Sequence, residues 1–244
     1  MNARPLEVLL LCFAHAGGSA QVFRGWQAQM PEGVQVHTVE LPGRGRRGRE
    51  PLQHDYTAMV DALADELAVE IAARQHRDEP LHYAAFGHSA GASFAFGVCA
   101  RLAERLRRPP LHCFFAAGLP PHLPRKARSA MSDAALLAEI RALSGTRPEV
   151  LEHPELMAFF LPILRADFAA YEGAVADRTR QLDCDFTLLA AARDDIAPQE
   201  VWAWQRHTSR EARTVSLAGD HFSVLQSAAL IDEIKHQLGE EILW

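Results

Sequence analysis

Short apolar runs recur along the chain, and longer amphipathic stretches separate them. Each run has the length and the apolar, β-branched or aromatic character that are typical of a buried strand. Strands that alternate with helical stretches predict βα units and a parallel sheet. The expected strands are 7–13, 34–40, 81–86, 111–117, 185–191 and 212–217.

The stretches between these runs have helical periodicity. Met59, Leu63, Leu67 and Ile71 recur at the spacing that puts side chains on one face of a helix. A helix with one apolar face packs that face against the sheet, so we expect the helices to flank the strands. The expected helices are 56–76, 90–107, 199–207 and 227–239.

One connection is much longer than the fold requires. More than sixty residues separate the expected strands at 111–117 and 185–191, whereas a crossover between parallel strands needs only about a dozen. Helical periodicity returns inside this connection, and several prolines interrupt it. We therefore expect a helical insertion at about 119–183 that acts as a lid. A rigid packing subdomain is the alternative. The periodic pieces of the insertion are 133–143 and 155–179.

Length and charge narrow the classes of function. The chain has 244 residues, a size that α/β folds often reach as a single domain, so we expect one domain over 1–244. The formal net charge is −6, which gives no overall basic field for nucleic acid. The apolar run at 8–13 is too short to cross a bilayer. The residues before this run lack the features of a signal peptide. We expect a cytoplasmic protein without nucleic-acid or membrane partners.

The cysteines give no sign of a metal site or of a disulfide framework. Cys12, Cys99, Cys113 and Cys184 are far apart, and each lies in an apolar segment. No CxxC or Cys/His spacing of a metal site is present. Buried free thiols fit a reducing compartment. We therefore expect no bound metal.

The segment Gly87–Gly91, which reads GHSAG, carries the strongest chemical signal. It follows an expected strand and precedes an expected helix, which is the context of the G-x-S-x-G nucleophile elbow. Ser89 would then project above the sheet at the start of a helix, where free N–H groups and the helix dipole favour an oxyanion. This motif predicts an α/β-hydrolase fold with Ser89 as nucleophile.

A nucleophilic serine needs a base, and the base needs a third group that orients it. In this fold the acid and then the histidine follow the serine along the chain. His221 follows the last expected strand and is the candidate base. Asp194 and Asp195 both follow the preceding strand, and generic spacing cannot separate them. Asp220 is a third carboxylate, although its position next to His221 is more typical of a turn residue.

The oxyanion donors should be two backbone N–H groups. One belongs to the residue after the nucleophile, Ala90, and the other to the loop after an early strand. That loop is 13–18, which reads FAHAGG, and Ala16 is its candidate donor. The two glycines of the loop would let the backbone approach a substrate closely.

Several motifs recur together in this order, and as a set they resemble one family. They resemble the type II thioesterases of nonribosomal peptide and polyketide synthesis, and also the medium-chain thioesterase of animal fatty acid synthesis. The similarity covers roughly 8–226. The motifs are FAHAGGSA at 13–20, LPGRG at 41–45, GHSAG at 87–91, FFLP at 159–162, the acidic pair at 194–195 with a following tryptophan, and GDHF at 219–222.

The resemblance implies an editing enzyme that hydrolyses acyl thioesters from the phosphopantetheine arm of acyl or peptidyl carrier proteins, without a cofactor of its own. It implies Ser89 as nucleophile, His221 as base and Asp195 as the acid. It also implies that the backbone N–H groups of Ala16 and Ala90 form the oxyanion hole.

Two other functions share much of this pattern. A carboxylesterase or lipase that acts on free esters would use the same three residues. A non-catalytic protein that binds acylated carriers is the other alternative, and the complete set of catalytic residue types argues against it.

An arginine cluster is the candidate surface for the carrier. Arg44, Arg46 and Arg47 follow the expected strand at 34–40, and ligands of parallel α/β sheets bind at the carboxyl ends of the strands. Carrier proteins are generally acidic, and guanidinium groups suit the phosphodiester of their arm. The alternative is a solvated loop. A second arginine run at 101–108 should lie at the far end of its helix and serves as a contrast.

Overall fold

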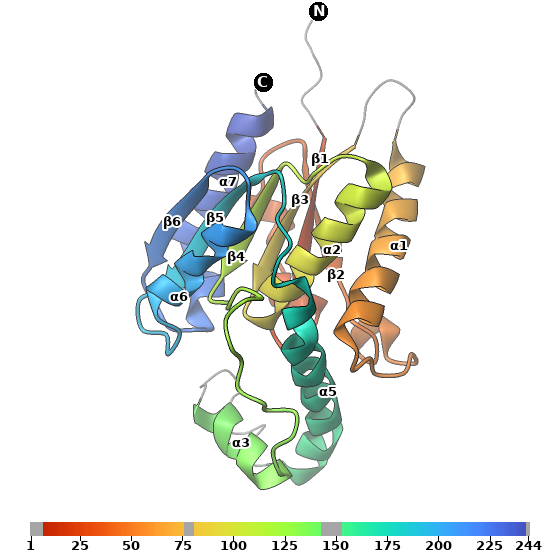
Figure 1. Cartoon of the computed structure of the whole chain (residues 1–244), viewed down its shortest axis with the longest axis vertical. Helices are drawn as coiled ribbons and strands as arrows, with labels where there is room; N and C mark the ends of the chain where they lie inside the picture. The colour runs from red at the N-terminus through yellow and green to blue at the C-terminus, as the bar shows by residue number, and fades with distance from the viewer. Residues whose placement is uncertain (1–6, 76–80, 143–152, 243–244) are drawn as a thin grey trace, which may run out of the picture.

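A computed structural model describes residues 7–75, 81–142 and 153–242 of the chain (Figure 1). Its centre is a six-stranded sheet with the strand order β2-β1-β3-β4-β5-β6. Every pair of neighbouring strands is parallel. All six expected strands are present, and the parallel sheet flanked by helices confirms the predicted fold class. The strands are β1 (Val8–Phe13), β2 (Val34–Val39), β3 (His82–His88), β4 (His112–Ala116), β5 (Asp185–Ala191) and β6 (Ala212–Leu217).

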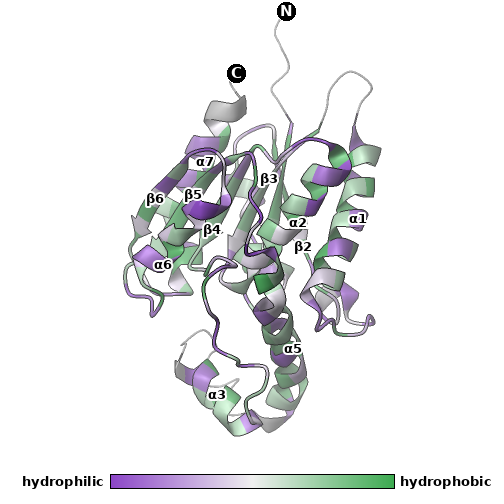
Figure 2. Ribbon diagram, viewed as in Figure 1, coloured by the Kyte–Doolittle hydropathy of each residue, from purple (hydrophilic) through white to green (hydrophobic). Residues whose placement is uncertain are grey.

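Helices cover both faces of the sheet, and the alternation of side chains along each strand explains why. In β1, Leu9 and Leu11 belong to the core on one face, whereas Val8 and Leu10 belong to the core on the other. A strand that is buried on both faces is apolar at every position, and Figure 2 shows hydrophobic residues concentrated on the central strands. The first core is covered by α1 (Tyr56–Arg74), α2 (Ala90–Leu106) and α6 (Pro198–Trp202), and the second by α7 (Ala228–Ile242) and the short helix η1 (Ala20–Phe23).

The long connection after β4 forms the expected helical insertion. Its described helices are α3 (Asp133–Ala142) and α5 (Pro154–Glu172), while its residues 143–152 lie outside the described part of the chain. In Figure 1 both helices reach beyond the carboxyl ends of the strands, at the end of the molecule away from the two termini. Leu136 and Ile140 of α3 pack with Met157 and Phe168 of α5 in a small core of their own.

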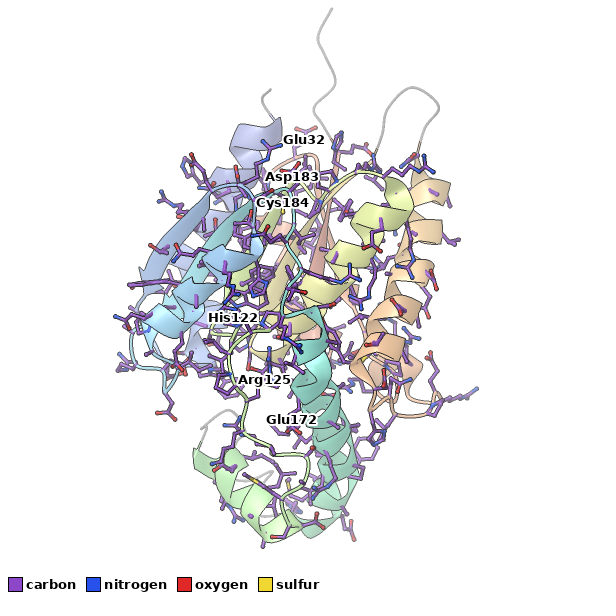
Figure 3. All side chains as sticks on the ribbon, viewed as in Figure 1. Glu32, His122, Arg125, Glu172, Asp183 and Cys184 are labelled. Carbon is purple, nitrogen blue, oxygen red and sulfur yellow. The ribbon has the colours of Figure 1, made fainter. Side chains whose placement is uncertain are left out.

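Arg125 ties the insertion to the body, and Glu172 joins two parts of the insertion (Figure 3). Arg125 donates to Ser93 Oγ at 3.1 Å, and its guanidinium lies 4.5 Å from the centre of the Tyr171 ring. Glu172, at the end of α5, accepts a hydrogen bond from the backbone N–H of Ser129 at 2.9 Å. These contacts join the segment after β4 to the last turn of α5.

The four cysteines are all buried and free. No helix in the described ranges is long and apolar enough to cross a membrane.

Candidate active site

Ser89 lies in the sharp turn between β3 and α2. Its backbone angles are φ 57° and ψ −121°, a region that costs a residue other than glycine about 1–3 kcal/mol. The flanking glycines are required by space: a Cβ at Gly87 would lie 2.4 Å from the backbone oxygen of Gly91, and a Cβ at Gly91 would lie 2.3 Å from that of Phe13. The strain and the close packing hold the Ser89 hydroxyl at the end of the sheet, as a nucleophile elbow requires.

His221 lies in the loop after β6, and its Nε2 is 2.9 Å from Ser89 Oγ. The strands β4 and β5 separate β3 from β6 in the sheet, so the loop after β6 must reach back across two strands. A hydrogen bond from His88 Nε2 to the backbone oxygen of His221, at 2.7 Å, holds this loop in place. The structure therefore brings the predicted nucleophile and base together.

His88 is a buried histidine that the sequence analysis did not single out. Burial holds the pKa of His88 well below its ordinary value, and the nearby rings of His221 and His15 lower it further. The neutral ring has one N–H group, and the bond to a carbonyl oxygen assigns that proton to Nε2. Within the described part of the chain, His88 Nδ1 has no hydrogen-bond partner. The one signal in the sequence was its place beside the nucleophile.

The acid that contacts His221 is Asp194. Its Oδ2 lies 2.8 Å from His221 Nδ1, and its Oδ1 accepts the backbone N–H of Ile196 at 3.1 Å. The side chain of Asp194 is only 3% exposed, so water competes little for the carboxylate.

The expectation that Asp195 orients His221 is therefore wrong by one residue in this geometry. The backbone N–H of Asp194 bonds to the oxygen of Ala191 in a tight turn after β5, and successive side chains of such a turn point in different directions. Asp195 is exposed and lines the cavity beside Ser89 instead. The family resemblance located the turn correctly, but not the residue within it.

Asp220 has the turn role that its position indicated. Its Oδ1 accepts the backbone N–H groups of Phe222 and Ser223 at 3.2 and 2.9 Å. These bonds lower the pKa of the Asp220 carboxyl, with Ser223 as the largest contributor. The carboxylate shapes the turn that presents His221.

The two expected oxyanion donors lie at the same end of the sheet. Ala90 is the first residue of α2, and the N–H groups of a first helical turn have no partner within the helix. Ala16 lies in the loop after β1, and the contact of Gly91 with the backbone of Phe13 and Ala14 brings this loop against the start of α2. His15 Nδ1 bonds to the backbone oxygen of Ala16 at 3.0 Å and so stabilises the conformation of this loop.

A cavity of about 250 Å³ opens beside the three residues. Its apolar wall includes Phe168 and Tyr171 of α5, so the insertion forms part of the site. Its rim carries charges of both signs. The lining residues are Ser89, Ala90, Leu119, Lys126, Arg128, Phe168, Tyr171, Asp194, Asp195, Ile196, Glu200 and His221.

The three arginines proposed as carrier contacts have different surroundings. Arg44 is only 6% exposed and forms a bidentate ion pair with Asp167. Arg47 pairs with Glu50 and Glu66. The expectation that Arg44 meets an external anion is therefore wrong, because its guanidinium is buried and already paired.

Arg46 is the member of the cluster that remains available. Its guanidinium is exposed and makes a long hydrogen bond, 3.5 Å, to the backbone oxygen of Thr38. It lines a second cavity of about 550 Å³, which lies between the loop after β2 and the insertion helix α5. Arg24 and the 63% exposed Phe159 line the same cavity.

The described residues contain no group of three or more His, Cys, Asp and Glu side chains that could hold a metal ion. The site brings Ser89, His221 and Asp194 together beside the two expected backbone donors. This arrangement suits acyl transfer through a serine nucleophile.

Comparison with known proteins agrees with this chemistry. The family model described as the thioesterase domain matches residues 9–238. The thioesterase PikA5 of Streptomyces venezuelae is 36% identical over 217 residues, which cover 88% of this chain and 75% of PikA5.

Two solved structures are similar over nearly the whole chain. The thioesterase RedJ of the prodiginine biosynthetic pathway in Streptomyces coelicolor is 34% identical, with a TM-score of 0.83, and the match covers 98% of this chain and 94% of RedJ. YbtT, a type II thioesterase of the yersiniabactin biosynthetic pathway, is 33% identical, with a TM-score of 0.81 over 99% of this chain and 97% of YbtT.

Proposed function

Because the chain belongs to the thioesterase domain family, we propose that it is a type II thioesterase that hydrolyses acyl groups from the phosphopantetheine arm of carrier proteins. Its relatives include a type II thioesterase of a mixed nonribosomal peptide and polyketide pathway. The observation that carries the proposal is the pair of hydrogen bonds that links Ser89, His221 and Asp194, at 2.9 and 2.8 Å.

The reaction follows from the roles of these three groups. Ser89 Oγ attacks the thioester carbonyl carbon while His221 Nε2 takes the hydroxyl proton. The Asp194 carboxylate holds the ring and stabilises the imidazolium. The carbonyl oxygen becomes an oxyanion, and the backbone N–H groups of Ala16 and Ala90 donate to it.

Collapse of this intermediate breaks the carbon–sulfur bond, and His221 returns its proton to the departing pantetheine sulfur. Water, deprotonated by His221, then attacks the Ser89 ester and releases the free acid. The product is a carrier with a free thiol that can be loaded again. None of these steps needs a cofactor from the enzyme, because the substrate brings the phosphopantetheine arm.

The partner in this proposal is an acyl or peptidyl carrier domain. The cavity that Arg24, Arg46 and Phe159 line is the candidate contact, because it combines two cationic side chains with an exposed aromatic ring. An acidic carrier and its phosphodiester would complement the arginines. We propose a cytoplasmic location, where the four buried thiols stay reduced.

The experiment that tests the function compares hydrolysis of acylated carrier proteins of several chain lengths with hydrolysis of simple esters of the same acids. A thioesterase favours the carrier-bound acyl group, whereas a carboxylesterase favours the free ester. A protein that only binds acylated carriers would release no acid from either.

The same experiment needs a variant that removes the nucleophile. Ser89→Ala should lower turnover by about three or more orders of magnitude, because triad residues act as a unit. It should also abolish labelling by a fluorophosphonate. A folded Ser89→Ala protein that keeps a tenth of the activity would exclude this mechanism.

A further inference from the structure

A buried carboxylate joins the insertion to the loop that holds an oxyanion donor. Asp167 of α5 is 1% exposed, and its Oδ2 accepts the backbone N–H of Gly17 at 2.7 Å. The same carboxylate forms the bidentate pair with Arg44. Arg44 also donates to the backbone oxygen of Gly18 at 3.3 Å. The pair therefore connects α5, the loop after β2 and the loop after β1.

These contacts fix one peptide plane from both sides. The Ala16 carbonyl accepts from His15 Nδ1 at 3.0 Å, and the N–H of the same peptide unit, on Gly17, donates to Asp167. A peptide unit is rigid, so its orientation limits the rotation of the neighbouring unit, which carries the Ala16 N–H. The His15 ring is itself held edge-on against the rings of His88 and Phe222, at 5.5 and 5.0 Å between centres.

The anchor acts on Gly17, a glycine whose backbone lies in the left-handed region. Its φ is 74°, and a Cβ at this position would lie 2.6 Å from Leu164 Cδ2 of α5. Glycine populates this region readily, but it also has the greatest freedom to leave it. An external acceptor for the Gly17 N–H removes that freedom.

Stability alone is a poor reason for such a pair. A buried ion pair gains little over well-packed apolar residues, because both charges lose their hydration. Arg44 Nε also has no hydrogen-bond partner within the described residues. The contact of this pair with the Gly17 and Gly18 backbone points to a positional role instead.

We infer that Asp167, held by Arg44, is a positioning residue that sets the direction of the Ala16 N–H in the oxyanion hole and so makes turnover depend on the seating of the insertion helix α5. The inference rests on the proposed function, because it assumes that Ala16 stabilises an oxyanion. Asp167 acts through the Gly17 peptide and touches no reacting atom.

The test removes both charges together, so that no lone charge is buried. The double variant Arg44→Met with Asp167→Leu should fold and lose the acceptor of the Gly17 N–H. Its matched control is Arg101→Met with Asp177→Leu. That ion pair is equally buried, at 5% and 2% exposed, but it lies between α2 and the segment after α5, away from the loop of Ala16.

Three quantities separate positioning from a structural role: kcat, KM and the inhibition constant of a trifluoromethyl ketone, whose adduct with Ser89 places an oxyanion in the hole. Loss of one oxyanion donor costs about 10²–10³ in kcat, so we expect misdirection of the Ala16 N–H to lower kcat by about ten- to a hundredfold. The inhibition constant should rise in parallel while KM changes by less than about threefold. The control pair should leave all three near the wild-type values.

A conservative variant supplies the rescue. Arg44→Gln with Asp167→Asn is neutral but keeps a carbonyl oxygen for the Gly17 N–H, and it should regain most of the lost turnover. Circular dichroism and thermal unfolding establish the folded fraction of every variant. The inference is overturned if the variant Arg44→Met with Asp167→Leu keeps the wild-type kcat. It is also overturned if the control variant Arg101→Met with Asp177→Leu shows an equal loss of kcat.

The substrates of this test are an acyl-pantetheine thioester and p-nitrophenyl acetate. Both need the oxyanion hole, whereas only the first reports on thioesterase activity. A wild-type protein that cleaves the ester but not the thioester would contradict the proposed function. Even then, the rate of ester hydrolysis in Arg44→Met with Asp167→Leu, compared with the rate in the wild-type protein, would decide the role of Asp167.

Discussion

Asp194 and His221 meet because the strands that precede them are neighbours. Ala191 at the end of β5 pairs with Leu217 at the end of β6, so the two loops start side by side. The Asp194 carboxylate then lies 2.8 Å from His221 Nδ1. A bond to Nδ1 leaves Nε2 directed at Ser89, which is the arrangement that a general base needs.

This contact predicts different effects from the two adjacent aspartates. Asp194→Asn should lower kcat by about 10³–10⁴, because the amide cannot stabilise the imidazolium and favours the wrong tautomer. Asp195→Asn should change kcat by less than about threefold, since Asp195 is exposed and Asp194 is the carboxylate that bonds to His221. Turnover at saturating substrate measures both. A severe loss in Asp195→Asn with an active Asp194→Asn would restore the assignment that the family resemblance implied.

Arg46 should affect the carrier but not the chemistry. Reversal of its charge in Arg46→Glu should raise the KM for an acylated carrier protein by about three- to tenfold, an expectation for loss of one rim charge at an interface. Hydrolysis of an acyl-pantetheine mimic should stay within about twofold. The control with the same change in net charge is Arg105→Glu, on the last turn of α2, where Arg105 pairs with Asp65. Equal effects from the two variants would reduce the role of Arg46 to net charge.

Phe168 should limit the length of the acyl chain. Its ring lines the cavity of about 250 Å³ beside Ser89, so Phe168→Ala should enlarge that space and shift kcat/KM toward longer chains. The same change should lower the free energy of unfolding by about 3 kcal/mol. Phe160→Ala is the control, since Phe160 packs in the same small core but does not line this cavity. A chain-length series of acyl-pantetheines measures the shift, and an unchanged profile in Phe168→Ala would contradict the prediction.

Local unfolding should need less free energy in the insertion than in the body of the protein. The small core of the insertion, built around Leu136, Ile140, Met157 and Phe168, is separate from the two cores that cover the sheet, and a region with few buried apolar contacts opens at low free energy. Amide hydrogen exchange should therefore be faster in α3 than in β3 and α2. Equal protection would favour a rigid packing subdomain.

His112 should make the protein less stable in acid. Burial lowers the pKa of His112 to about 4, whereas an unfolded histidine has a pKa of about 6.5. Between these values the unfolded chain binds a proton that the folded chain does not, so stability falls as the pH drops from about 6.5 to about 4. At about 1.4 kcal/mol per unit, the loss reaches about 3 kcal/mol.

The variant His112→Gln checks this effect. Its amide can still bond to Thr187 Oγ1, the partner of His112 Nε2 at 2.8 Å, but it does not titrate. Urea unfolding from pH 7 to pH 4 should give a flatter dependence of stability on pH in this variant. The control His54→Gln removes an exposed imidazole. An unchanged slope in His112→Gln would exclude His112 as the source.

The sequence by itself predicted the strands and two of the three residues that the structure brings together at the site. The four central strands, β1, β3, β4 and β5, were predictable because a strand buried on both faces must be apolar along its length. The edge strands β2 and β6 are only partly buried, and short runs with apolar and β-branched residues predicted them. Ser89 and His221 were predictable because the nucleophile elbow needs glycine on both sides of a strained serine and because the base follows the last strand. These requirements are local, so the residue types next to each position are enough to predict it.

Only the tertiary structure decided between Asp194 and Asp195, and only it revealed the surroundings of Arg44. Two adjacent carboxylates in one turn have the same local sequence, and the direction of each side chain depends on how the turn sits against β6. Arg44 has the local sequence of a surface loop, yet its partner Asp167 is 123 residues away along the chain. Contacts of this kind form when distant segments pack together, so a local sequence pattern does not predict them.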